Sequence, residues 1–216
     1  MDFLGAFSSE NLLFLLEGFY VTLKVAFISI IFSFIIGGLL GILRFAKIPF
    51  LSKVLAIVVE VIRNLPLLLI ILFTYFALPE VGINLSITVS AIVALTIFES
   101  AMLAEIVRGG LNSIEKGQME AARSSGLSYI QALRLIILPQ ALRRMVPNLV
   151  SQFISLLKDT SLAVIIALPE LLHHAKIIQA QQASYVIPIF ILIALMYFVV
   201  NYGLSLIARR LELKSV

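Results

Sequence analysis

The stretch Lys116–Pro139 reads K-G-Q-M-E-A-A-R-S-S-G-L-S-Y-I-Q-A-L-R-L-I-I-L-P, and it interrupts a chain that otherwise consists of long apolar runs. Ser128 followed three residues later by Gln131 is typical of a capping box, so a helix is expected to start there. Gly126 suits the left-handed position that ends a preceding helix. This interruption therefore predicts two short helices that meet at Gly126, the second with one apolar face.

The composition of the whole chain places it in a membrane. Hydrophobic residues make up 61% of the 216 residues, charged residues 13%, and the mean hydropathy is +1.11. The length allows one transmembrane domain, residues 1–216, and no sizeable soluble domain. Cysteine is absent, which excludes disulfides and cysteine-based metal or catalytic sites. The net charge of +4 does not indicate nucleic-acid binding, because the basic residues lie beside apolar runs, where they set topology in the lipid bilayer.

Five apolar segments are long enough to cross the membrane, which takes about 20 residues. We therefore expect an all-α integral membrane protein with five transmembrane helices, at about 19–43, 54–78, 87–107, 146–168 and 186–207. Basic residues follow the first, third and fifth segments, as Arg44, Lys47 and Lys53, then Arg108 to Arg144, then Arg209, Arg210 and Lys214. Because basic loops remain in the cytoplasm, the N-terminus is expected outside and the C-terminus inside. This orientation puts Lys116–Pro139 in the cytoplasm.

A family resemblance rests on this same stretch. Glu120-Ala121-Ala122, Gly126 and Ile136-Ile137-Leu138-Pro139 resemble the E-A-A…G…I-x-L-P signature of permease subunits in ABC importers, with the same spacing throughout. Ala104–Gly110 upstream and Leu156–Leu162 downstream resemble the polar amino acid branch of these permeases. The resemblance covers the chain from about Thr22 to the C-terminus.

The resemblance implies a type I ABC importer permease fold in the bacterial cytoplasmic (inner) membrane. It also implies that the loop at about 109–139 carries a coupling helix, Gly117–Leu127, seated in a groove of an ATP-binding subunit. The residues expected to make this contact are Gly117, Glu120, Ala121, Ala122, Gly126 and Leu127.

The energy for transport is expected to come from partners. The sequence contains no G-x-x-x-x-G-K-[ST] phosphate-binding motif, so this chain is not expected to be an enzyme or to bind a cofactor, and ATP and Mg²⁺ belong to the partner ATPase. Five helices are too few to enclose a solute pathway securely. We therefore expect two ATP-binding subunits, a second permease, most simply in a homodimer, and an extracytoplasmic solute-binding protein.

Polar residues within the apolar segments are the candidate solute site, because such residues usually face a bundle interior or a water-filled cavity. Asn64, Glu99 and Asp159 each lie ~15 to 20 Å from the end of their segment, at a common central plane. Glu60 lies one helical turn from Asn64.

Two of these segments are also expected to break. Pro66 biases Leu65 away from helix, and Lys158-Asp159-Thr160-Ser161 splits an apolar run. A fresh helix starting near Ser161 would direct backbone amides at the α-carboxylate of an amino acid, while Asp159 or Glu60 would take its ammonium group. Thr160 belongs to the same candidate site. The alternative is that Glu60–Arg63 and Lys158–Asp159 are ion pairs that only hold helices together.

Glu99 has no basic residue nearby in its own segment, so it is either protonated or paired with a cation. A cationic amino acid such as arginine, lysine or histidine would supply that charge, with Phe98 or Tyr75 stacking on it. This interpretation favours a cationic solute. The alternative is a neutral or acidic polar amino acid with the buried acids structural, and a more distant one is an ion-coupled secondary transporter.

Two further features are expected to be structural. Gly37 and Gly41 are expected to let another helix approach closely. No metal site is expected, since His173-His174 lacks further ligands in sight and is interpreted as an exposed helix turn.

Overall fold

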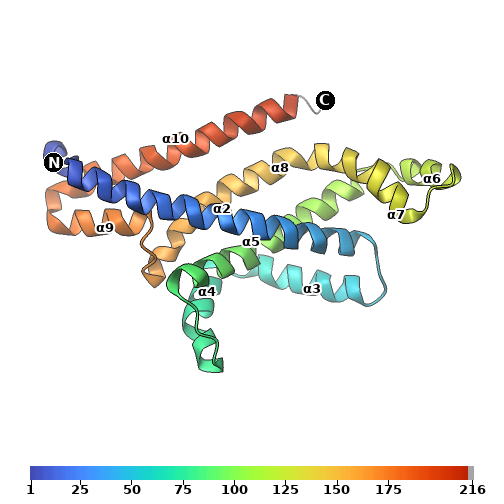
Figure 1. The fold of residues 1–216 in the computed structure, drawn as a ribbon, viewed down its shortest axis with the longest axis horizontal. Coiled ribbons are helices and arrows are strands. Elements are labelled where there is room, and N and C mark those ends of the chain that lie inside the picture. The colour runs from blue at the N-terminus through green and yellow to red at the C-terminus, as the bar shows by residue number, and fades with distance from the viewer. Residues whose placement is uncertain (214–216) are drawn as a thin grey trace.

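The computed structural model describes residues 1–213, so Lys214 lies outside the described residues. All regular elements of this part are helical. After a short helix α1 (Phe3–Ala6), the long helix α2 (Ser9–Phe45) runs most of the length of the molecule (Figure 1). Ser8 caps α2 by accepting a hydrogen bond from the backbone N–H of Asn11. The helix α2 forms the scaffold against which the others pack.

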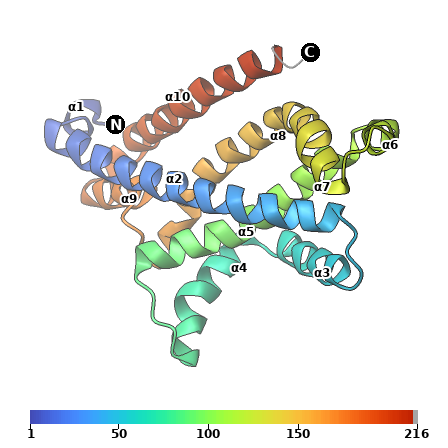
Figure 2. The same cartoon turned by 45° about the vertical axis from the view of Figure 1, so that its right-hand side comes forward.

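The second apolar segment is broken at the expected place. Helix α3 (Leu51–Asn64) ends at Leu65, whose backbone is extended, and α4 (Leu67–Leu72) begins after Pro66. The axis turns by 101° between α3 and the run that α4 begins. This run continues through the π-helical η1 (Phe73–Ala77) and the 3-10 turn η2 (Leu78–Val81), and it leaves the bundle at a steep angle (Figure 2). Since Pro disfavours helix at the residue before it, Pro66 explains the break.

Helix α5 (Ile87–Asn112) crosses the molecule against α2, and small residues allow the close approach. A Cβ atom added at Gly37 would lie 2.7 Å from the carbonyl oxygen of Ser100, and one at Gly41 would lie 2.7 Å from that of Ala104. Nothing lies within 4 Å of the corresponding position at Gly38. The expectation that Gly37 and Gly41 serve close helix packing is confirmed.

The cytoplasm-assigned loop forms two short helices as expected, α6 (Lys116–Ser124) and α7 (Tyr129–Ala132). The π-helical η3 (Leu133–Ile137) joins α7 to the long helix α8 (Leu138–Asp159), which continues as the 3-10 helix η4 (Thr160–Ile166). Figure 1 places α6 and α7 at the end of the molecule opposite the N-terminus. The predicted apolar segment at 146–168 is therefore the later part of one longer helical run, Tyr129–Ile166.

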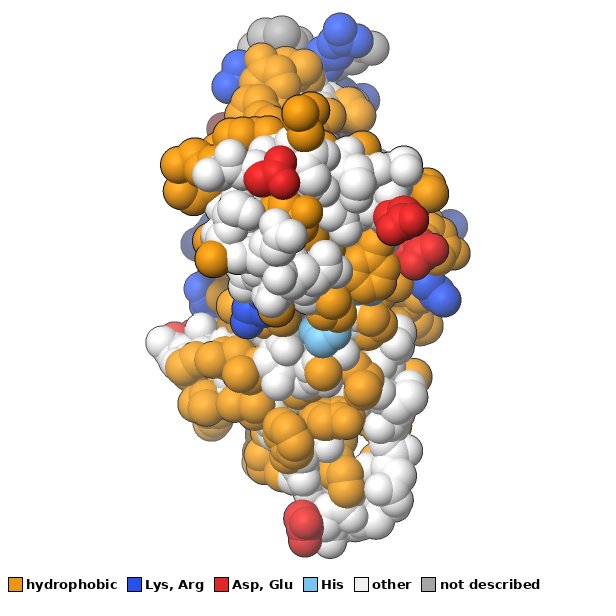
Figure 3. All heavy atoms as spheres, turned by 90° about the vertical axis from the view of Figure 1, so that its left-hand side faces the viewer, with side chains coloured by type: hydrophobic (Ala, Val, Ile, Leu, Met, Phe, Trp, Pro, Cys, Tyr) orange, Lys and Arg blue, Asp and Glu red, His pale blue; other side chains and the backbone are white. Residues whose placement is uncertain are grey.

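The remaining elements are α9 (Leu171–Gln181), the 3-10 turn η5 (Ala183–Tyr185) and the long α10 (Val186–Leu213). Helix α9 lies at the same end as the N-terminus, beside α2. Seen end-on, this end is mainly apolar or uncharged, with scattered acidic and basic groups and one visible histidine (Figure 3).

Four of the described helices are long and apolar enough to cross a membrane, and the bent pair α3 and α4–η2 makes a fifth if it is one span. The expectation of an all-α protein with five transmembrane helices agrees with this count. Many large apolar side chains on α2, η1 and α10 are exposed, among them Phe27, Phe73 and Phe198, as is usual for helices that face lipid. One of several buried apolar clusters joins α2, α4, α5 and η4.

Candidate functional site

The local geometry of the predicted coupling region, α6 and α7, agrees with its sequence pattern. Gly126 has φ +90°, and the N–H of Leu127 bonds to the carbonyl of Ala122 at 3.2 Å, which closes the end of α6. Ser128 and Gln131 form the expected capping box, with reciprocal hydrogen bonds of 3.2 and 2.8 Å. Both short helices therefore have defined ends, and Gly126 sets the angle between them.

The predicted coupling residues do not all face outward. Gly117, Glu120, Ala121 and Gly126 are exposed, and Leu127 is half-buried. Ala122 is buried, so its side chain packs against the rest of this chain and is not free to touch a partner. The apolar face that α7 and η3 share is buried as expected at Ala132 and Ile137, while Tyr129 remains 41% exposed.

A cluster of charged side chains joins α2, α3 and α5 in the half of the bundle nearer to α6. Glu105 on α5 binds Arg44 of α2 at 2.9 Å, lies 3.8 Å from Arg63 of α3, and pairs with Arg108 one turn along its own helix. Glu60 pairs with Arg63 at 3.5 Å. The arrangement neutralises one carboxylate with three guanidinium groups, so Glu105 holds three helices together. The sequence indicated the Glu60–Arg63 pair, whereas the convergence of Arg44 and Arg63 on Glu105 depends on packing between helices.

Glu60 and Asn64 are brought together on the exposed face of α3, just before the break. The side-chain amide of Asn64 donates to the carboxylate of Glu60 at 3.0 Å and to the Glu60 carbonyl at 2.8 Å. Glu60 is thus shared between Asn64 and Arg63. This face carries polar groups within an apolar segment, and such groups are costly unless water or another protein covers them.

Glu99 has a different environment, deep between α5 and α8. It is only 1% exposed, and one of its oxygens accepts a 3.1 Å hydrogen bond from the side-chain amide of Gln152. The other oxygen, Oε1, is buried without a hydrogen-bond partner among the described residues. No basic side chain of the described part of the chain lies within 4.0 Å of Glu99. Phe98 beside it is half-buried and packs against the core around α4.

The segment after Asp159 differs from the sequence expectation. The backbone does not restart as a freshly capped helix: Asp159 is itself helical and its side chain caps nothing, and η4 continues α8 in a tighter form. Thr160 is fully buried and donates to the carbonyl of Leu157, while the Ser161 hydroxyl donates to that of Lys158. Because the chain stays helical here, the backbone amides near Ser161 are not left as a free carboxylate cradle. Asp159 and Lys158 form no ion pair among the described residues. The alternative expectation, that a Lys158–Asp159 ion pair holds helices together, is therefore not met.

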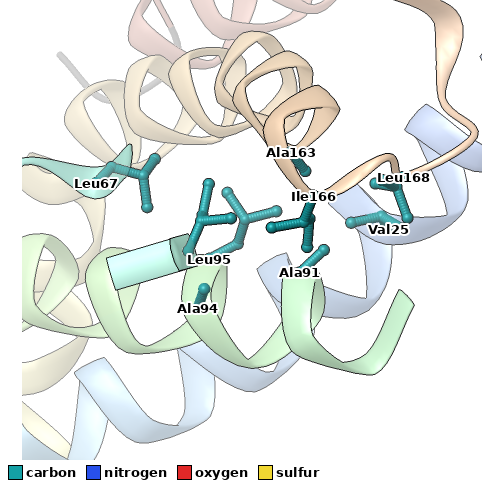
Figure 4. Close-up of a cluster of buried hydrophobic side chains, with 9 residues drawn as sticks. Val25, Leu67, Ala91, Ala94, Leu95, Ala163, Ile166 and Leu168 are labelled. Atoms are coloured by element: carbon teal, nitrogen blue, oxygen red, sulfur yellow. The ribbon is translucent and has the colours of Figure 1, made fainter. Parts of the chain in front are cut away.

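The two irregular segments nonetheless meet. Leu67, the first residue of α4, packs in one buried cluster with Ala163 and Ile166 of η4, and Leu95 of α5 lies between them (Figure 4). The break at Pro66 and the change of helix type at Thr160 therefore adjoin the same core. Asn64 and Asp159 each lie a few residues before this cluster along the chain.

Sequence reasoning missed Gln152, because an amide on an amphipathic helix has no signature that names its partner 53 residues away. It also missed a polar cluster at the other end. Glu170 is fully buried and caps α9 through the N–H groups of Leu172 and His173, and Tyr197 donates to it at 3.2 Å.

The interpretation of His173-His174 as an exposed turn is wrong for His174. Its side chain is 7% exposed, bonds through Nδ1 to the carbonyl of Phe14 and stacks on the Phe14 ring. The described residues contain no group of three or more potential metal ligands.

Comparison with known proteins places the chain in a family. Residues 30–215 match the family described as "Binding-protein-dependent transport system inner membrane component". The chain is 70% identical, over the full length of both proteins, to the probable glutamine ABC transporter permease protein GlnP of Bacillus subtilis. It is 39% identical to the probable glutamine permease GlnM of the same organism, over 94% of each chain.

A solved structure agrees with this match. A crystal structure of an amino acid ABC transporter with histidines superposes with a TM-score of 0.90 at 31% identity, covering 99% of each chain. A methionine ABC transporter in an inward-facing conformation shares the fold, with a TM-score of 0.75 at 23% identity. Each of these relatives is named as a permease or a transporter of the ABC class. The chain therefore belongs to the permease subunits of ABC importers, in the branch that serves polar amino acids, and is an integral protein of the cytoplasmic membrane.

Proposed function

We propose that this permease moves a neutral amino acid with a side-chain amide, such as glutamine, into the cell by alternating access. Both B. subtilis relatives described above are named for glutamine, one at 70% identity over the whole chain. The solute would bind at the level of Asn64, Glu99 and Asp159, with Glu60 and Thr160 at the edges of the site. Phe98 and Ser161 complete the set of candidate contacts.

The environment of Glu99 is the observation that carries this proposal. A carboxyl group that is 1% exposed, with one neutral donor and no cation beside it, is far less costly when protonated. A protonated carboxyl offers one donor and one acceptor, which is the hydrogen-bonding complement of a carboxamide. This supports the neutral alternative over the cationic solute that the sequence favoured.

A cationic amino acid is the second candidate, because the unpartnered oxygen Oε1 of Glu99 would be satisfied by an ammonium or guanidinium group. The histidine-containing structure also supports it. Equilibrium binding to the detergent-purified transporter, without its solute-binding protein, separates the two. Glutamine should bind, excess arginine should not displace it, and Glu99→Gln should keep glutamine affinity within about tenfold. Arginine binding that Glu99→Gln abolishes would replace the amide proposal with the cationic one.

The assembly would contain two permeases, two ATP-binding subunits and an extracytoplasmic solute-binding protein. The second permease is a second copy of this chain or a relative resembling GlnM, since B. subtilis has both relatives. With the N-terminus outside, α6 faces the cytoplasm, and its exposed residues Gly117, Glu120 and Ala121 meet the ATP-binding subunit.

The coupling assignment has its own test. Glu120→Lys adds a charge of opposite sign to the exposed face of α6, so the ATP-binding subunit should no longer co-purify. Glu80→Lys, the same exchange on an exposed residue of η2, should leave co-purification unchanged. Normal transport by Glu120→Lys would count against a coupling role for α6.

A further inference from the structure

A groove of about 460 Å³ lies beside the coupling helix, and the proposed function does not account for it. One wall is the end of α2 and the following turn, Phe45, Ala46 and Lys47. The other wall comes from the end of α5 and from α6, including Met119 and Glu120. The groove thus lies between the α2–α3 turn and the coupling helix α6, although these segments are far apart in the sequence.

The α2–α3 turn that forms one wall is held in an unusual backbone conformation. Lys47 and Phe50 both have positive φ, 52° and 66°, although neither is glycine, and residues other than glycine rarely adopt such conformations. Ser52 donates to the carbonyl of Leu43 at 2.8 Å and closes the turn. The turn leaves Lys47 exposed at the rim and Phe50 80% exposed nearby. Strained, well-tied turns of this kind concentrate at sites of contact.

The residues that line the groove indicate which kind of molecule fits it. Its floor includes the buried side chains of Leu111, Ile114 and Ile137, while its rim carries charges of both signs: Lys47, Lys116, Glu115 and Glu120. An apolar floor within a mixed polar rim is the anatomy of a protein–protein contact. Anionic lipid headgroups instead favour clusters of basic residues alone, and two carboxylates at the rim would repel them.

We infer that the ATP-binding subunit inserts an apolar side chain into this groove, so that it grips the permease at the α2–α3 turn as well as at the coupling helix. This inference rests on the proposed function, since Glu120 belongs to both surfaces. The second contact lies next to Arg44, which binds Glu105 at 2.9 Å, and Glu105 lies 3.8 Å from Arg63 on α3. Movement of the ATP-binding subunit therefore reaches the inner half of the broken span through α2 as well as through α8.

The absence of cysteine from the chain allows a direct test with single cysteines. Lys47→Cys reports on the groove rim, Ala121→Cys on the coupling helix, and each is labelled with a water-soluble maleimide in nanodiscs, with and without the ATP-binding subunit. Bound partner should slow labelling of both by about fivefold or more, because reaction requires an accessible thiolate. Slowing at Ala121→Cys with unchanged labelling at Lys47→Cys would overturn the groove contact and leave the proposed function intact. No slowing at Ala121→Cys would instead refute the docking of α6 itself.

Two further measurements distinguish a protein occupant of the groove from lipid. Anionic vesicles that slow Lys47→Cys labelling without the ATP-binding subunit would assign the groove to lipid and overturn the inference. Ala46→Phe fills the groove and should weaken association of the ATP-binding subunit by about tenfold, whereas Lys53→Phe, an exposed position outside the groove, should not. Equal association of both variants with the subunit would also overturn it.

Discussion

Glu105 and Glu99 lie on the same helix, α5, yet their surroundings are opposite. Glu105 is 25% exposed and meets the guanidinium groups of Arg44, Arg63 and Arg108. Glu99 is 1% exposed and has one amide donor, with its second oxygen unpartnered. The first carboxylate is fully neutralised and ties helices together. The second leaves hydrogen-bonding capacity unused in the buried interior of the bundle, which suits its role in the proposed solute site.

Removing the Glu105 carboxylate, which binds side chains of three helices, should have the largest effect on stability. Glu105→Ala leaves three converging guanidinium groups without their common acceptor, and we expect the free energy of unfolding to fall by about 3 kcal/mol. Thermal unfolding of the detergent-solubilised permease measures this as a lowered Tm. Glu60→Ala is the matched control, because its ion pair with Arg63 is exposed and worth less than about 1 kcal/mol. Equal loss in the two variants would mean that Glu105 is not the centre of the network.

A third carboxylate, Glu170, refines the comparison, because it is as buried as Glu99 but accepts three hydrogen bonds. It lies outside the membrane-spanning segments, between η4 and α9. Burial raises its pKa from 4.5 to about 7, against the lowering effects of the Leu172 and His173 amides, Tyr197 and Lys176. Burial is therefore not fully offset even by three donors.

The raised pKa of Glu170 predicts a pH dependence. Its folded pKa lies above its unfolded value, so its contribution to stability is fully present below pH 4.5 and is lost as the pH rises through about 7. Between pH 5 and pH 8 we expect a loss on the order of 2 kcal/mol, seen as a falling Tm. Burial lowers the pKa of His173, which acts in the opposite direction below pH 6.5. Glu170→Gln should remove the Glu170 part of the slope. An unchanged slope in that variant would assign the pH dependence to other groups.

The close contact between α2 and α5 can be tested separately from the charges around Glu105. It depends on glycines of α2 that lie against the backbone of α5. Gly41→Ala places a Cβ 2.7 Å from the carbonyl oxygen of Ala104, directly beside Glu105, and should cost about 1 to 2 kcal/mol by overpacking. Gly38→Ala has nothing within 4 Å and should leave the Tm unchanged or slightly raised. Both are measured by thermal unfolding. A neutral Gly41→Ala would show that α2 and α5 can separate without loss.

The coupling region was predictable from the sequence because its structure is local. Gly126, Ser128 and Gln131 interact with neighbours a few residues away, so spacing alone indicated that one short helix ends and a second begins at this point. The break at Pro66 was predictable for the same reason, since proline acts on the residue beside it. Hydropathy likewise indicated the apolar segments and the membrane class.

The proposed solute site depends on contacts between residues that are far apart in the sequence, and the sequence indicated these contacts only in part. The polar positions Asn64, Glu99 and Asp159 were visible, but the partner of Glu99 depends on how α8 is rotated against α5. The choice of Gln152 follows from that rotation, which hydropathy does not encode. The expected helix restart at Ser161 was wrong because Asp159–Ser161 can continue a helix with side chains bonded to the preceding turn, as Thr160 and Ser161 are.

The smallest expected effect concerns the bond between Glu99 and Gln152, and it tests the protonation state on which the proposed function depends. A double-mutant cycle of Glu99→Leu, Gln152→Leu and the double variant isolates their interaction in thermal unfolding. A hydrogen bond between neutral groups should give a coupling of about 1 kcal/mol, whereas a charged carboxylate should give about 2 to 3 kcal/mol. Glu99→Leu alone should cost little, because it also removes the unpartnered oxygen. A coupling in the higher range would mean that Glu99 is ionised, and would shift the preferred solute from an amide to a cation.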